Sequence, residues 1–376
     1  MRVLSLDKAA ELPKDSVRWA LAFTSDSEDV DRILRLPFPT FGITSHGGVF
    51  TSKGYVRGTY LLVSERDDEV NARSYLVGGN VHTIEEPLRD VARDILENFG
   101  LPDMVMIFPT LGLEERVVRT LDDAFSRKVR IFGGTAADND FSGDWWTFAN
   151  GRKANSGVSV VAFKSPNPIL STFHAGYILT KRSGVITRAS HPEGGGTTIY
   201  EIDGKPAAQV YASWLKERGF DIGDVLEKGG IIPFEIAGLN PIARVYGDDI
   251  VVSHVFEVLP KENALSVLSH INEGERVYHA TATESFLVSR TAVTVRKSLK
   301  EMLSIIGGVL IYCAGCIAPI SGRLDEIAKI YGKMVKGAPF VGAATYGEQG
   351  SLIVEGRIMN FHANQMIHTV LFTKER

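Results

Sequence analysis

The sequence predicts an α+β protein with βαβ units, in which two halves are each built on mixed β-sheets with helices packed on them. Three pairs of short apolar runs predict this class, because a polar or helix-patterned segment separates the two members of each pair. Hairpin signals between the pairs predict antiparallel strands in the same sheets. The paired runs cover residues 19–23 with 38–48, 104–108 with 129–138, and 309–312 with 339–350.

The first third of the chain alternates between strand and helix patterns. The polar cluster at 24–27 after the first apolar run is a good helix cap, and a hairpin is expected over 49–65 with its turn at 52–54. Apolar residues at helical spacing predict helices at 88–99 and 117–125, and Gly100 with Pro102 ends the first of them. The remaining strands are expected at 74–77, 104–108 and 129–132.

The middle third is richer in strand patterns, and the last third alternates again. Pro206 suits the first position of a helix, so we place the boundary between two domains there, at 1–205 and 206–376. Helices are also expected at 295–303 and 324–334, and a hairpin at 245–252. Strands are expected at 145–148, 158–163, 173–179, 198–201, 250–258, 275–281, 309–312, 352–355 and 368–373.

Composition excludes several classes of protein. The 376 residues carry a formal charge of −4 and no long basic run, so nothing indicates a nucleic-acid groove. Two cysteines give no disulfide framework and the N-terminus lacks a signal-peptide core, so a cytoplasmic location is expected. The uncharged stretch 302–322 is long enough for a membrane span, but Gly307-Gly308 interrupts it. We therefore expect a helix end, a glycine turn and a buried strand there, and no membrane partner.

Each strand pair ends in a polar bend rich in glycine, and these bends are the candidate ligand site. In the bend at 339–350, backbone N–H groups would bind a carboxylate, Thr345 and Tyr346 would add hydroxyls, and Glu348 would bind an ammonium. The alternative is a tight turn between core strands. The other two bends contribute similar candidates, which are Thr44, Ser45, His46, Gly133, Gly134 and Asp138.

Cysteine and histidine supply the remaining candidates. Cys313 and Cys316 have the spacing of a redox or metal pair, but two cysteines alone cannot complete a four-thiolate zinc site, and reduced, buried thiols are the simpler interpretation. The second interpretation is that Cys313 lines the ligand site. His362 with Asn364 would donate two hydrogen bonds to a ligand, or belong to a satisfied loop network. No histidine pair has the spacing of a zinc hydrolase, so no metal or other cofactor is expected.

Several of these segments together resemble the FIST family, in which an N-terminal FIST domain precedes a FIST C domain, over nearly the whole chain. Two departures are Cys316, where the family usually has arginine, and Gly48, where it usually has glutamate. The resemblance implies a sensory protein for small ligands, with amino acids as the usual proposal and a fused signalling domain as the common arrangement. The segments that carry it are 42–48, 133–138, 200–207, 312–315, 342–348 and 361–365.

We therefore expect a stand-alone binding protein for an amino acid or related polar metabolite. No output domain is recognisable in the chain, so the signal would pass to a separate partner protein, and homo-oligomerisation is left open. The alternative is an enzyme in which Cys313 is the nucleophile and His46 or His362 the base, because such chemistry needs a thiolate beside an imidazole. A scaffold without a small ligand is a third hypothesis.

Overall fold

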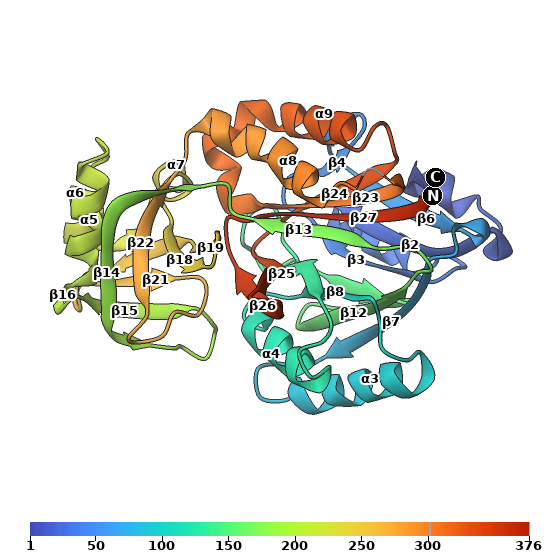
Figure 1. Ribbon diagram of the computed structural model, residues 1–376, viewed down its shortest axis with the longest axis horizontal. Coiled ribbons are helices and arrows are strands. Elements are labelled where there is room, and N and C mark those ends of the chain that lie inside the picture. The colour runs from blue at the N-terminus through green and yellow to red at the C-terminus, as the bar shows by residue number, and fades with distance from the viewer. Residues whose placement is uncertain (301, 376) are drawn as a thin grey trace.

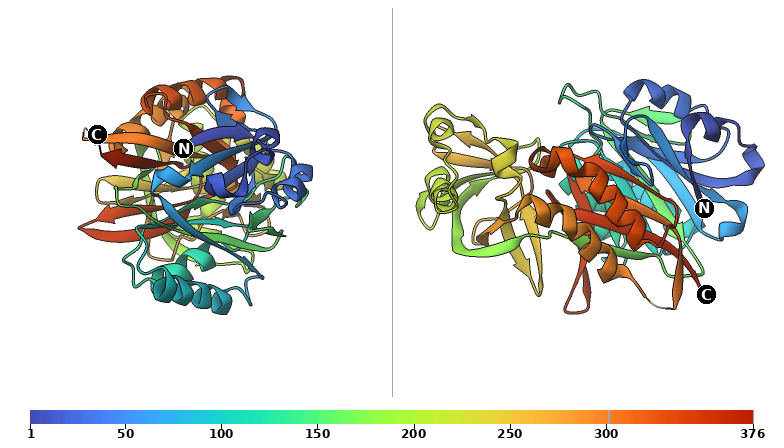
Figure 2. Two further views of the ribbon diagram at one scale, coloured as in Figure 1. Left: turned by 90° about the vertical axis from the view of Figure 1, so that its right-hand side faces the viewer. Right: turned by 90° about the horizontal axis from the view of Figure 1, so that it is seen from above.

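A computed structural model describes residues 1–300 and 302–375. The protein has a large body, which contains three six-stranded sheets, and a smaller lobe with a nine-stranded sheet. The lobe projects from one end of the body, and both chain ends lie on the opposite side (Figures 1 and 2). The predicted class of mixed sheets with helices packed on them is confirmed.

The body consists of three repeats of one strand–helix plan. The first repeat contains β1 (Arg2–Ser5), α1 (Leu6–Ala10), β2 (Val17–Thr24), α2 (Val30–Ile33), β3 (Thr40–Thr44), β4 (Val49–Thr51), β5 (Gly54–Val56) and β6 (Thr59–Glu65). The second contains β7 (Asn71–Gly78), α3 (Glu85–Asn98), β8 (Met104–Pro109), α4 (Glu114–Ala124), β9 (Ile131–Gly134), β10 (Thr147–Ala149), β11 (Arg152–Ala154) and β12 (Gly157–Lys164).

The third repeat is interrupted by the lobe. It contains β13 (Leu170–His174) and, after the lobe, α8 (Glu284–Ser298), β23 (Leu303–Cys313), α9 (Leu324–Met334), β24 (Phe340–Thr345), β25 (Glu348–Val354), β26 (Arg357–Ala363) and β27 (Ile367–Glu375). The lobe contains β14 (Ile178–Ser190), β15 (Thr197–Ile202), β16 (Lys205–Pro206), α5 (Ala207–Lys216), α6 (Gly223–Lys228), β17 (Gly230–Ile231), α7 (Phe234–Ala237), β18 (Ile242–Tyr246), β19 (Asp249–Ser253), β20 (Val255–Leu259), β21 (Ala264–Val267) and β22 (Arg276–Thr281).

The three sheets of the body have equivalent strand orders and exchange hairpins in a cycle. The orders are β1-β6-β2-β3, β7-β12-β8-β9 and β13-β27-β23-β24, and in each the last two strands are parallel. The hairpin that follows each parallel pair then leaves its own sheet. Hairpin β4–β5 joins β24, hairpin β10–β11 joins β3, and hairpin β25–β26 joins β9. Each repeat therefore completes the sheet of another.

An equivalent glycine lies where each parallel pair of strands is closest. Gly42 opposes Ala22, Gly133 opposes Ile107, and Gly342 opposes Leu310. A Cβ atom at Gly133 would lie 1.6 Å from the carbonyl oxygen of Ile107, and one at Gly42 would lie 1.8 Å from that of Ala22. No side chain fits at such distances, so the backbone approach explains why these positions are glycine.

The inner faces of the three sheets pack into one shared core, and the helices cover their outer faces. Aromatic and aliphatic side chains from all three repeats meet in this core, among them Trp19, Met106 and Phe372. Helices α1 and α2 cover the first sheet, α3 and α4 the second, and α8 and α9 the third. Figure 1 shows the last two pairs on opposite sides of the body.

Most predicted strands and helices are confirmed, and five details are wrong. Helix α8 ends at Ser298, and β23 already begins at Leu303 and continues through Gly307-Gly308 with only a register shift, so no glycine turn separates helix and strand. The strands expected at 173–179 and at 250–258 are each broken, the first between β13 and β14 and the second between β19 and β20. The hairpin at 49–65 ends with β5, and β6 belongs to another sheet. Strand β26 was not expected.

Two further expectations concern the whole chain. No helix among the described residues is both long enough and apolar enough to span a bilayer. The division after residue 205 stays a prediction, and its position falls in the lobe, within β16.

Candidate functional site

The three polar bends predicted from the sequence meet at one end of the shared core. A cycle of three backbone hydrogen bonds joins them. In each bond, the donor is an N–H group that follows one pair of parallel strands, and the acceptor is a carbonyl group at the end of another pair. The bonds are His46 N to Ala344 O (3.0 Å), Ala137 N to Thr44 O (3.0 Å) and Tyr346 N to Thr135 O (3.3 Å). The N–H group of Tyr346, which lies in the bend whose N–H groups we expected to bind a ligand carboxylate, is one of the three that join the repeats.

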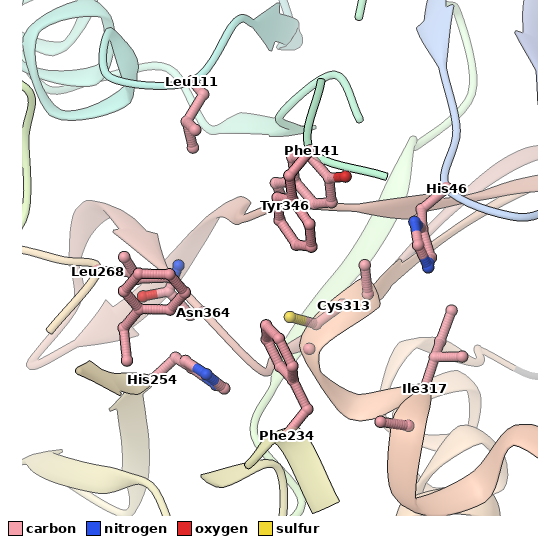
Figure 3. A pocket seen from close by; sticks show the side chains of 14 residues that line it. His46, Leu111, Phe141, Phe234, His254, Leu268, Cys313, Ile317, Tyr346 and Asn364 are labelled. Atoms are coloured by element: carbon pink, nitrogen blue, oxygen red, sulfur yellow. The ribbon is translucent and has the colours of Figure 1, made fainter. Parts of the chain in front are cut away.

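A cavity of about 360 Å³ lies beside this junction, between the body and the lobe. Figure 3 shows that side chains from the bends, from β23 and from the lobe converge on it. Most of its lining is aromatic or aliphatic, and none of the lining residues is Lys, Arg, Asp or Glu. They are His46, Leu111, Phe141, Phe234, His254, Phe256, Leu268, Cys313, Ala314, Gly315, Ile317, Ala318, Tyr346 and Asn364.

Stacked rings form one wall of the central cavity. Phe141 stacks on Tyr346 with ring centroids 4.6 Å apart and planes within 7°, and it also lies parallel to Phe234 at 6.1 Å. Phe234, at the start of α7, stacks in turn on His254 at 5.5 Å. Phe141 is 54% exposed, although large aromatic side chains are usually buried. The rings therefore link the body to the lobe across the cavity.

Asp138 positions Phe141 and does not line the central cavity, but it lines a smaller polar hollow with Thr44 and Ser45. Its carboxylate accepts hydrogen bonds from the backbone N–H groups of Phe141 (2.7 Å) and Gly143 (2.7 Å) and from Oη of Tyr346 (2.6 Å). Burial alone would raise the pKa of Asp138, but these hydrogen bonds lower it overall. Phe141 itself has a left-handed backbone, with φ of 59°. The ionised carboxylate thus stabilises a strained loop that places an aromatic ring over the cavity.

Two side chains that line the cavity carry a polar atom without a partner. Gln365 Nε2 donates to His254 Nδ1 at 2.6 Å, so the proton of His254 is on Nε2, and this N–H group has no acceptor. Burial lowers the pKa of His254 to about 4, which keeps the ring neutral. Asn364 has an unpaired Oδ1 and is 1% exposed. One donor and one acceptor therefore lack protein partners in this otherwise apolar site.

Two predicted residues, Thr345 and Glu348, point into the protein interior and do not line the cavity. Glu348 is fully buried, and it accepts hydrogen bonds from Thr345 Oγ1 (2.9 Å) and from the backbone N–H of Met366 (3.0 Å). Burial raises the pKa of Glu348 well above its ordinary value, so a fixed negative charge is not favoured there. An ammonium group in the central cavity would not contact this carboxyl group.

Of the residues predicted in the first bend, one lines the central cavity and two form hydrogen bonds between repeats. His46 lines the cavity, and its Nδ1 donates to the carbonyl oxygen of Asp138 at 2.8 Å. Ser45 Oγ joins two repeats, since it donates to Gly48 O (2.6 Å) and accepts from Ala344 N (2.9 Å). Thr44 Oγ1 accepts from the backbone N–H of Trp146 at 2.9 Å. Neither hydroxyl lies in the cavity lining.

Gly133, Gly134 and His362 belong to the interface between the second and third repeats. The two glycines pair with Gln349 and Glu348 of β25. His362 Nδ1 accepts from Gln349 Nε2 (3.1 Å), and its Nε2 donates to Leu268 O in the lobe (3.2 Å). Both ring nitrogens are therefore occupied, so His362 cannot act as a base in this arrangement.

Cys313 lies in the cavity lining with Cys316 behind it. Cys313 ends β23, is 2% exposed and has a thiol whose pKa is raised well above its ordinary value by burial. Cys316 is fully buried and lies 3.3 Å from Oη of Tyr177. Both cysteines are free thiols.

Sequence reasoning missed the residues that make most of the wall. Phe234, His254, Phe256 and Leu268 come from separate elements of the lobe, and no local spacing connects them with the bends. Phe141 did carry a signal, because it is a single large aromatic residue in the polar loop 138–144. A large aromatic side chain in an otherwise polar surface loop indicates that it packs against another part of the protein.

A partly open cavity lined by convergent segments, at the junction of a repeat-built body and an inserted lobe, is the architecture of a small-molecule binding protein. The chain belongs to the FIST family. The model of the FIST N domain matches residues 18–205, and that of the FIST C domain matches residues 207–351. FIST domains are sensory domains that are associated with small ligands and signalling.

Two comparisons with individual proteins complete this picture. A crystal structure of a chorismatase matches over 98% of this chain and 97% of that chain, with 8% sequence identity and a TM-score of 0.36. No curated protein sequence matches the chain.

Proposed function

We propose that this protein senses a small molecule that binds in the central cavity. The observation that carries the proposal is the composition of the wall, to which all three repeats and the lobe contribute. His46 comes from the first repeat, Phe141 from the second, Tyr346 from the third and Phe234 from the lobe. A volume of about 360 Å³ lies in the range of cavities that enclose metabolites.

The lining favours a ligand with an apolar or aromatic body and few polar groups. Phe141, Tyr346 and Phe234 offer ring faces against which a planar or aliphatic group would pack. The free donor of His254 and the free acceptor of Asn364 suit one carboxylate and one ammonium group, respectively. An amino acid with a large apolar side chain, or a related metabolite, therefore fits better than a small, highly charged one.

The ligand would transmit its signal through the contact between lobe and body. Both parts contribute walls, so an occupied cavity stabilises the arrangement in which the rings of Phe141 and Phe234 lie parallel. The lobe is connected to the body by only two chain segments, 175–177 and 282–283. A separate signalling protein would recognise the occupied arrangement.

A thermal-unfolding screen tests the proposal. The twenty amino acids and their deaminated or decarboxylated relatives are added at millimolar concentration, and a ligand at 100 times its Kd stabilises the folded state by about 2.7 kcal/mol. We expect a concentration-dependent rise in Tm with phenylalanine, tyrosine, tryptophan or leucine or with one of their relatives. Folded protein whose Tm rises with none of these compounds would contradict the proposed ligand class.

An enzyme that uses Cys313 is a second candidate, because His46 and Cys313 line the same cavity. Against it, burial raises the pKa of Cys313, whereas a nucleophilic cysteine requires the thiolate. The discriminating measurement is the rate of alkylation by iodoacetamide at pH 7. A rate for Cys313 above that of a free thiol in a short peptide would favour the enzyme, and a slower rate would exclude this role.

A further inference from the structure

Two thiols and a buried cation lie together in the floor of the central cavity. Cys313 is at the end of β23, and Cys316 is in the short 3-10 helix that follows, Ala314–Cys316. The chain turns between them, and the two thiols are close enough for each to shift the pKa of the other. Only Cys313 lines the cavity, whereas Cys316 is fully buried. The pair is thus open to a small reagent from one side.

The cation is Arg290 of α8, which is 1% exposed. Its Nη1 donates to the carbonyl oxygens of Ala175 and Gln365, both at 2.7 Å, while Nε and Nη2 have no hydrogen-bond partner among the described residues. No salt bridge to a carboxylate is formed by Arg290 among the described residues. A buried guanidinium without a countercharge is costly, so a neighbouring acidic group is needed to compensate it.

Cys316 is the acidic group that best meets this need. The titratable groups around Arg290 and Cys316 are Cys313, Tyr177, Tyr312, Glu348 and His174. Burial lowers the pKa of His174 to about 4, so this ring carries no charge at neutral pH. Burial would raise the pKa of Cys316, but the hydrogen bond from Cys313, the positive charge of Arg290 and the contact with Tyr177 lower it overall. The pKa values of Tyr177, Tyr312, Cys313 and Glu348 are all raised, mainly by burial. The negative charge is therefore favoured on the Cys316 sulfur.

We propose that Cys313 and Cys316 form a reversible disulfide in the cavity floor, so that the ligand site also responds to peroxides. Cys313, which faces the cavity, reacts first, as the thiolate that forms when its proton passes to the Cys316 sulfur. A peroxide breaks its O–O bond, one oxygen forms a sulfenic acid on Cys313 Sγ, and the other leaves as water. Cys316 Sγ then attacks Cys313 Sγ, the S–S bond forms, the S–O bond breaks, and hydroxide leaves and takes a proton from solvent. Two thiols and one hydrogen peroxide thus give one disulfide and two waters.

Arg290 is a positioning residue in this sequence of steps. Its charge favours the sulfur anion of Cys316, and thiolates rather than thiols attack sulfur. Oxidation removes that anion and draws the Cys313 sulfur away from the cavity toward Cys316. Because Cys313 belongs to the lining, oxidation changes the surface that a ligand meets. This last consequence rests on the proposed ligand site, whereas disulfide formation does not.

A redox titration of the full-length protein without ligand tests the disulfide. The folded chain is treated with hydrogen peroxide or equilibrated in glutathione buffers, free thiols are trapped with N-ethylmaleimide, and the intact mass is measured. We expect both cysteines to lose their reactivity together in a monomer, and dithiothreitol to restore them. The same chain unfolded in urea is the control. Thiols that stay free in the folded protein, under conditions that oxidise the unfolded control, would overturn the proposal.

Single cysteine variants test the order of the steps. In Cys316→Ser, the cavity-facing Cys313 remains, and we expect peroxide to give a sulfenic acid that dimedone traps. In Cys313→Ser, the buried Cys316 remains, and we expect at least tenfold less dimedone adduct because peroxide has no access. Equal labelling of both variants would contradict the assigned order.

The role of Arg290 has a readout of its own. Arg290→Lys keeps the charge, and we expect disulfide formation to follow the wild-type pH profile. Arg290→Met removes the charge, so the profile should move to higher pH. A wild-type profile in folded Arg290→Met would overturn the positioning role. Thermal unfolding shows whether each variant is folded, and if Arg290→Met does not fold, the wild-type titration and the cysteine variants decide the proposal.

Discussion

The backbone N–H of His46 donates a 3.0 Å hydrogen bond to the carbonyl oxygen of Ala344. These two residues lie at the ends of equivalent strands in the first and third repeats, and two equivalent hydrogen bonds complete a cycle through the second. The cycle fixes the bends relative to one another, so the cavity wall beside it has a defined shape before any ligand binds. Preorganisation of this kind reduces the free-energy cost of binding.

Replacement of Gly133 by alanine is expected to prevent stable folding. The added Cβ would lie 1.6 Å from the carbonyl oxygen of Ile107, so β8 and β9 must separate, at a cost of about 4 kcal/mol or more. Gly322→Ala is the matched control, because no atom lies within 4 Å of the place that its Cβ would occupy. We expect the control to remain within about 0.5 kcal/mol of wild type in urea unfolding. Similar unfolding midpoints for both variants would show that the strands can move apart freely.

Asp138→Ala should destabilise the protein most strongly at neutral pH. The variant loses hydrogen bonds from Phe141, Gly143 and Tyr346 to an ionised carboxylate, together worth about 2 kcal/mol. The folded pKa of Asp138 is below the ordinary value of 3.8, so this contribution is complete above pH 4 and is lost as the pH falls through the folded pKa. Unfolding measured at pH 7 and in acid checks both statements.

The control for Asp138 is the exposed Asp67→Ala, since the described residues give the Asp67 side chain no hydrogen bond. We expect the free energy of unfolding of this control to differ from that of wild type by less than about 0.5 kcal/mol at either pH. If the difference in unfolding free energy between wild type and Asp138→Ala is the same at neutral pH and in acid, the carboxylate charge is not involved.

Because of Glu114, part of the free energy of unfolding should decrease as the pH rises. It is buried at the start of α4, and burial raises its pKa from 4.5 to about 7, despite the hydrogen bond from Thr135. Between these two values the unfolded chain is ionised and the folded chain is not, so unfolding releases a proton and becomes easier with rising pH. The slope is at most about 1.4 kcal/mol per pH unit.

Glu114→Gln removes this component and isolates it from other titrations. Buried histidines such as His254 and His368 have lowered pKa values and act in the opposite direction over part of the same range. The quantity to compare is therefore the difference in unfolding free energy between Glu114→Gln and wild type, measured from pH 4 to pH 8. We expect the variant to gain relative stability as the pH rises; a difference that does not vary with pH would contradict the shift.

Phe234→Ala is expected to weaken ligand binding without unfolding the protein. The variant removes the lobe's ring from the stack with Phe141 and His254, and loss of a packed aromatic contact should weaken binding about tenfold or more. Phe286→Ala removes a ring that is 41% exposed on α8 and does not line the cavity. Titration calorimetry with the compound that gives the largest thermal shift should show the loss only for Phe234→Ala. Equal affinity in both variants would place the ligand elsewhere.

The sequence suggested one shared site at the three bends, because each copy shows the same local order of apolar run, glycine and hydroxyl residues, but it did not show that the bends meet. It did not predict the hairpin exchange, because an edge strand such as β9 pairs equally well, by pattern alone, with any hairpin of suitable polarity. The pairing of β9 with β25 depends on tertiary packing.

The sequence also did not predict the direction in which each polar side chain points. Glu348 and Tyr346 are two residues apart, yet Tyr346 faces the cavity while Glu348 bonds to the backbone of Met366 in the interior. Only the position of each side chain relative to the cavity separates a ligand contact from an internal hydrogen bond. The aromatic wall of the lobe was missed for a different reason, since its members come from elements that are far apart in the chain.

The exchange of hairpins also affects how the chain emerges from the ribosome. Strand β9 is complete at Gly134, but its partner β25 begins only at Glu348. At ordinary rates of translation the nascent chain therefore keeps an open strand edge for roughly 10 to 40 seconds. Such an edge invites pairing with neighbouring chains, so we expect this protein to depend on chaperones during synthesis and to refold slowly after dilution from denaturant.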